Sequence, residues 1–108
     1  MSIKYFYKAF ALKDEIKVSE FKGTCIDTGY QQCSTWFLVN TETGGSRLLG
    51  GNEVSASFHE SKEEAILYEL VTWEELRVES REKGIEDERD PAKRVRMCRD
   101  ALEVLLLK

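Results

Sequence analysis

The chain has 108 residues, of which 42% are hydrophobic and 33% charged, and its net charge is −4. This length suits one domain, residues 1–108, with a single modest core, and this composition excludes a disordered chain. No apolar run approaches the ~20 residues of a membrane span, and the first residues lack the apolar segment of a signal peptide, so we expect a soluble, cytoplasmic protein.

The first part of the chain has the pattern of a β-sheet. Five short segments alternate apolar and polar residues between turn residues, as strands do: 3–12, 16–26, 35–40, 46–49 and 54–58. In the second segment the apolar positions change phase, which predicts a bulge near Ser19 and Glu20 or a bend at Gly23. A turn is expected at 27–29, followed by a polar loop at 30–34.

The pattern changes to helical spacing at Ser61. Ser61 and Glu64 form an S-x-x-E capping box, in which the serine oxygen accepts a hydrogen bond from the Glu64 amide. A second box begins at Thr72, so the favoured prediction is a break or kink there rather than one continuous helix. Lys83 and Gly84 predict the end of this helical region.

A last helix is predicted to begin at Asp90 and Pro91, since aspartate is a good N-cap and proline suits the first helical position. Its predicted buried stripe is Val95, Cys98, Leu102 and Leu105. The fold class is therefore α+β. A curled antiparallel sheet or small open barrel of about five strands (residues 1–59) precedes two or three C-terminal helices (residues 60–108).

The three cysteines, Cys25, Cys33 and Cys98, lack C-x-x-C spacing. An odd number of cysteines in a cytoplasmic chain favours three free thiols over a Cys25–Cys33 disulfide, with Cys98 in the helical core.

Few residues suggest catalysis. His59 is the single histidine, which excludes a two-histidine metal site, and its position before the helix cap favours a surface or capping role over a Cys-His pair. The glycine-rich segments 44–47 and 50–52 lack a phosphate-loop lysine and are typical of turns. We therefore expect a protein that is not an enzyme and needs no cofactor or metal.

Charge is distributed unevenly along the chain. Residues 1–59 are balanced, residues 60–90 carry twelve acidic and five basic side chains, and residues 91–108 carry two acidic and five basic ones. An acidic helical surface can meet a basic partner, although a solvated helix face explains the same pattern. Aromatic residues beside acidic ones suggest the candidate partner-binding residues, which are Tyr68, Glu69, Trp73, Glu74 and Glu75.

Four cations, Lys93, Arg94, Arg96 and Arg99, lie in the first half of the last helix, where the helix dipole disfavours them. With the sheet aromatics Tyr5, Tyr7 and Trp36 they would make a platform for single-stranded nucleic acid. The isoelectric point of about 5.1 argues against this alternative.

The leading functional hypothesis is a small interaction module that binds a protein partner as an inhibitor or adaptor. The size of the chain and the helix start within residues 58–65 resemble small proteins of phages and mobile elements, and this likeness favours action by binding. The alternatives are a nucleic-acid-binding domain and a small enzyme. Neither the partner nor self-association can be read from the sequence.

Overall fold

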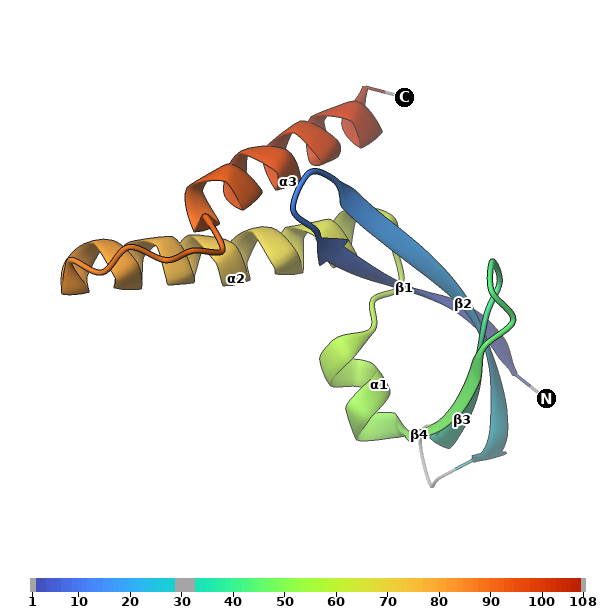
Figure 1. The fold of residues 1–108 in the computed structure, drawn as a ribbon. Coiled ribbons are helices and arrows are strands. Elements are labelled where there is room, and N and C mark those ends of the chain that lie inside the picture. The colour runs from blue at the N-terminus through green and yellow to red at the C-terminus, as the bar shows by residue number, and fades with distance from the viewer. Residues whose placement is uncertain (1, 29–32, 108) are drawn as a thin grey trace. The chain divides into compact units, whose positions relative to one another are not determined.

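The computed structural model describes residues 2–28 and 33–107. Within these residues, four strands and three helices follow one another (Figure 1): β1 Ile3–Ala11, β2 Ile16–Thr28, β3 Cys33–Asn40, β4 Ser46–Gly50, α1 Gly51–Ser57, α2 Lys62–Lys83 and α3 Pro91–Leu106. The α+β prediction is confirmed. The sheet is open, with the strand order β1-β2-β3-β4, so the prediction of a curled or barrel-like sheet of about five strands is wrong.

Of the predicted fifth strand, residues 54–58, the first four lie in helix α1 instead, and Phe58 is the C-cap of this helix. Val54 and Phe58 are both buried. Two apolar residues four apart lie on the same side of a helix as well as of a strand, so the alternation read from the sequence fitted both periods. Beyond the helix, His59 keeps strand-like pairing, through two backbone hydrogen bonds with Tyr7 of 2.7 and 2.9 Å.

The residues group into two compact units, and β1, β2 and α2 each contribute to both. The first unit contains residues 1–8 and 18–65. Its core joins side chains from β1, β2, β3, α1 and the residue that follows α1: Phe6, Cys25, Trp36, Leu38, Val54 and Phe58. α1 packs against β3 and β4 (Figure 1).

Two glycines of the first unit lie where a side chain would collide with a neighbour. An ideal Cβ on Gly23 would be 2.6 Å from the Phe6 ring and 3.0 Å from Leu38. One on Gly51, the first residue of α1, would be 2.6 Å from the Cys33 carbonyl oxygen. These close approaches let Phe6 cross β2 and let α1 start directly against β3.

The observed irregularities of β2 lie near its end. In its pairing with β3, which runs from Phe21 to Thr28, the register shifts fall between Cys25 and Thr28, and the register is regular at Gly23, where a bend was one predicted alternative. Ser19 and Cys25 are both buried. The predicted turn and loop fall largely on residues 29–32, which lie outside the described residues.

Cys25 and Cys33 form a disulfide, with their Cα atoms 6.0 Å apart, so the prediction of three free thiols is wrong. The sequence could not show this because it required the pairing of β2 with β3, which brings Thr28 opposite Cys33 and Cys25 opposite Trp36. Cys98 is free and fully buried, as predicted.

The second unit contains the end of the β1–β2 hairpin, residues 9–17, and residues 66–108. Its buried apolar side chains include Ala9, Ile66, Val95 and Cys98. Leu102 and Leu105, predicted to be buried with the last two, are half-buried. No helix in the described part of the chain is long and apolar enough to cross a membrane.

Helix α2 is continuous through Thr72, so the predicted break is wrong. The Thr72 hydroxyl donates a hydrogen bond of 2.9 Å to the Tyr68 carbonyl, one turn back, which satisfies the side chain inside the helix. The predicted ends are confirmed. Ser61 Oγ accepts from the Glu64 amide at 3.1 Å, and Gly84 follows the helix with a φ of 65°.

Candidate functional site

The clearest surface feature of the second unit is the solvent-exposed face of α2. Successive residues of a helix point about 100° apart, so Val71 and Val78 share one direction, and Glu75 and Glu82 lie close beside them. Both valines are more than two-fifths exposed. The helix therefore presents apolar and acidic side chains on its outer face as well as apolar ones on its inner face.

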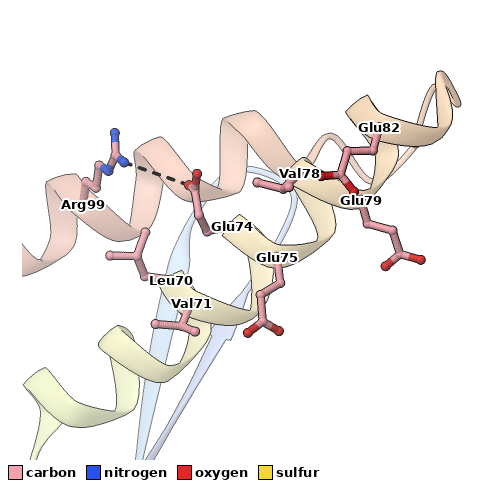
Figure 2. Close-up of a pocket in the computed structure, with 8 residues that line it drawn as sticks. All are labelled: Leu70, Val71, Glu74, Glu75, Val78, Glu79, Glu82 and Arg99. Atoms are coloured by element: carbon pink, nitrogen blue, oxygen red, sulfur yellow. Dashed lines mark ion pairs between the residues drawn. The ribbon is translucent and has the colours of Figure 1, made fainter.

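A groove of about 510 Å³ runs along this face (Figure 2). Seven of its lining residues belong to α2 and one to α3: Leu70, Val71, Glu74, Glu75, Val78, Glu79, Glu82 and Arg99. Leu70 and Glu74 lie towards Arg99, the valines lie in the middle, and the remaining glutamates form the outer rim. We call this surface the α2 groove.

Two of the four groove carboxylates are engaged within the protein. Glu74 accepts hydrogen bonds from the Arg77 guanidinium, which lower the pKa of its carboxyl group, and Arg99 lies 3.9 Å from its other oxygen. Glu79 pairs with Lys83 at 2.7 Å, and this hydrogen bond lowers the pKa of Glu79. Both groups are ionised at neutral pH.

Glu75 and Glu82 are exposed and make no ion pair within residues 2–28 and 33–107. They are seven residues apart on one helix, which separates them by about 10 Å. The outer rim of the groove therefore carries two carboxylates whose charge nothing in the described chain balances.

The sequence-predicted partner residues are only partly brought together. Glu74 and Glu75 line the groove, whereas Tyr68 and Trp73 do not. Tyr68 is 51% exposed, as expected for at least one of the two aromatics. Trp73 has internal contacts: its Nε1 donates to Glu69 at 3.0 Å, and the Arg94 guanidinium lies 4.8 Å from its ring centre. Trp73 and Glu69 therefore stabilise the helical unit.

The predicted basic cluster is largely used for packing. Lys93 pairs with Asp14 at 2.9 Å, and Arg94 donates to the Ala11 carbonyl at 3.1 Å. Both contacts join α3 to the β1–β2 hairpin of the same unit. This tertiary role explains cations at a helix N-terminus, where the dipole alone disfavours them. Arg99 faces Glu74, which leaves Arg96 exposed.

The three aromatics proposed as a stacking platform differ in exposure. Trp36 is 8% exposed and packs edge-on against Phe6 in the core, so it is not available to a base. Tyr7 donates to Glu20 at 3.0 Å, and Tyr5 is half exposed.

No cysteine has the properties of a nucleophile. Cys25 and Cys33 are oxidised, and burial raises the pKa of Cys98 to about 11, so this thiol stays protonated at neutral pH. Within the residues that the structure describes, no three Asp, Glu, His or Cys side chains gather as metal ligands would.

Sequence reasoning missed Val71 and Val78, which form the middle of the groove. The signal was present as a spacing of seven residues, repeated four positions later by Glu75 and Glu82. It was hidden because the expected break at Thr72 would have placed the two valines on different helices.

Comparison with protein-family models, with curated proteins and with solved structures found no significant match to this chain.

Proposed function

We propose that this protein is a non-enzymatic interaction module, an inhibitor or adaptor, and that the α2 groove is the surface that docks its protein partner. The observation that carries the proposal is the exposure of Val71 and Val78 between the Arg99 side of the groove and its acidic rim. Burying such side chains in a partner is favourable, and the surrounding charge would steer and orient the encounter.

The charge of the groove supports a protein partner over a nucleic acid. Carboxylates at Glu75 and Glu82 repel phosphates, whereas lysine and arginine side chains of a protein would balance them. Three of the four α3 cations also face groups of their own chain. The groove therefore favours a basic protein surface with apolar side chains.

A capture experiment with matched variants tests this proposal. Val71→Ser combined with Val78→Ser removes the apolar middle of the groove, while Val104→Ser makes the same change at an exposed position of α3 outside it. Partner capture by the double variant should fall tenfold or more, with an unchanged melting temperature, and Val104→Ser should capture normally. Equal capture by all three proteins would place the interface elsewhere.

Charge reversal tests the groove best at carboxylates that the chain itself does not engage. Glu74 already contacts Arg77 and Arg99, so its reversal would disturb the fold as well as a partner. Glu75 and Glu82 are the better pair, because both are exposed and unpaired in the described chain.

A cytoplasmic location is part of the proposal. The Cys25–Cys33 disulfide is the observation that opposes it, since disulfides rarely persist in reducing compartments. Thiol trapping in intact cells decides between a cytoplasmic location and an oxidising compartment. Labelling of Cys25 and Cys33 by the trapping reagent supports the cytoplasm, and protection of both residues indicates an oxidising compartment.

A further inference from the structure

We infer that the segment docked in the α2 groove is an α-helix that carries cationic side chains seven residues apart, beside a seam of aliphatic side chains. This inference rests on the proposed function and specifies its partner. It follows from the spacing of the groove residues and from which of them have unbalanced charge.

The apolar middle of the groove has the spacing of a helix-pairing seam. Val71 and Val78 are two turns apart on the same side of α2, with Leu70 next to them towards α3. In paired helices, two positions in every seven carry the side chains that insert between those of the facing helix, and the valines supply one of these two positions. β-branched residues suit such a seam because their side chains are stiff.

The unbalanced charges repeat at the same interval. Glu75 follows Val71 by four residues, and Glu82 follows Val78 by four. Glutamates beside an apolar seam pair with cations of the facing helix and select the partner. Glu79 already forms an ion pair with Lys83. Glu75 and Glu82 are therefore the carboxylates of the outer rim that a partner would neutralise.

The spacing of Glu75 and Glu82 along α2 favours a helix over an extended peptide. Two residues seven apart on a helix lie about 10 Å apart on one side. On a strand, side chains of one face recur about every 7 Å, so successive ones fall at about 7 and 13 Å and miss this spacing. A partner helix can place its cations opposite Glu75 and Glu82 and, at the same time, its aliphatic side chains against Val71 and Val78.

A second copy of this chain does not provide the required surface. Pairing two α2 grooves would bring Glu75 and Glu82 against carboxylates of like charge. The exposed cations of α3, Arg96 and Arg99, are three residues apart and are followed by Asp100 and Glu103. The complementary helix therefore belongs to another protein.

Designed peptides test the inference on the full chain. Both are helix-forming peptides of about 20 residues, long enough to lie along the groove. The first has lysines seven apart beside a leucine and valine seam, and the second has the same composition with the lysines on the opposite face. Fluorescence anisotropy should show the first binding at least tenfold more tightly.

Variants of the protein locate that binding. Glu75→Gln with Glu82→Gln should weaken the first peptide about tenfold. The matched control, Glu86→Gln with Glu88→Gln, removes the same charge from exposed loop positions outside the α2 groove and should bind normally. Conversely, Glu75→Lys with Glu82→Lys should prefer a peptide in which glutamates replace the lysines.

The outcomes separate this inference from the proposed function. Equal binding of both peptides, or equal weakening by both glutamine pairs, would mean unspecific charge attraction and would overturn the inference. Failure of the first peptide to bind would also overturn it. If cellular partner capture still required Val71 and Val78, the groove would remain the interface with a partner of another shape.

Discussion

Gly23 shows how strongly one residue constrains the core of the first unit. It is buried in β2, and the Phe6 ring and Leu38 occupy the space where its side chain would project. Gly23→Ala should therefore lower the free energy of unfolding by about 1–3 kcal/mol through overpacking. Chemical denaturation of both proteins measures this difference.

Gly45→Ala is the matched control for that change. Gly45 is exposed, and its nearest neighbour is 3.4 Å from the ideal Cβ position. The control should unfold like the wild type. A tolerated alanine at position 23 would mean that Phe6 does not cross the strand as closely as described.

Cys98 gives a residue-scale prediction about pH. Burial raises the pKa of its thiol from 9.0 to about 11, so the folded state holds this proton more tightly than the unfolded chain. The stabilisation is complete below pH ~9 and is lost as the pH rises towards ~11. Over this interval the wild type should lose about 1–3 kcal/mol of unfolding free energy that Cys98→Ala does not lose.

Urea denaturation at a series of pH values measures this effect. The Cys98→Ala protein is the reference, because lysine and tyrosine side chains titrate in the same interval in both proteins. Parallel curves for the two proteins would show that burial does not keep the Cys98 thiol protonated over this pH interval.

At the scale of the element, the start of α2 is held by a local hydrogen bond. Ser61 Oγ accepts from the Glu64 amide, and alanine at position 61 would leave this amide without its cap. Ser61→Ala should cost about 0.5–2 kcal/mol of stability. Circular dichroism melts measure it, with the exposed Ser55→Ala of α1 as a control that should change little. If Ser61→Ala melted at the same midpoint as Ser55→Ala, that result would contradict the cap.

Local signals in the sequence predicted helix boundaries well but could not choose between competing local structures. The cap at Ser61, the end at Gly84 and the Asp90–Pro91 start depend on residues within a few positions of one another, and all three are observed. The spacing of Val54 and Phe58 fits a helix as well as a strand, and the Thr72 hydroxyl is satisfied within a continuous helix, so both segments were mispredicted.

At the candidate site too, local signals predicted some residues, while the contacts of others depended on the folded chain. Glu74 and Glu75 could be proposed from sequence because acidic runs are visible there. The engagement of Trp73 by Glu69 and Arg94, by contrast, needs residues from two helices. Which carboxylates remain unbalanced is likewise a property of the folded chain.

At the scale of the whole molecule, three elements run through both compact units, which argues for one cooperative folding transition. β1, β2 and α2 each place residues in both units, so neither unit can lose these elements alone. The slowest-exchanging amides of the two units should report the same opening free energy in native-state hydrogen exchange. Two clearly different values would show that the units unfold independently.

The overall charge predicts weak interaction with nucleic acid. The chain carries a net charge of −4, and Lys93, Arg94 and Arg99 face groups of their own chain. We expect no micromolar binding to RNA or single-stranded DNA at physiological ionic strength. A salt-sensitive micromolar complex in fluorescence anisotropy would instead favour the nucleic-acid alternative.

The close approach at Gly51 has a consequence for how relatives of this protein can diverge. A Cβ there would meet the backbone oxygen of Cys33, which no rotamer change can move away. Gly44 and Gly84 have positive φ but open space around them, and asparagine tolerates that conformation. Over evolutionary time, positions 44 and 84 should alternate between glycine and asparagine, while position 51 admits no side chain as long as α1 begins against β3.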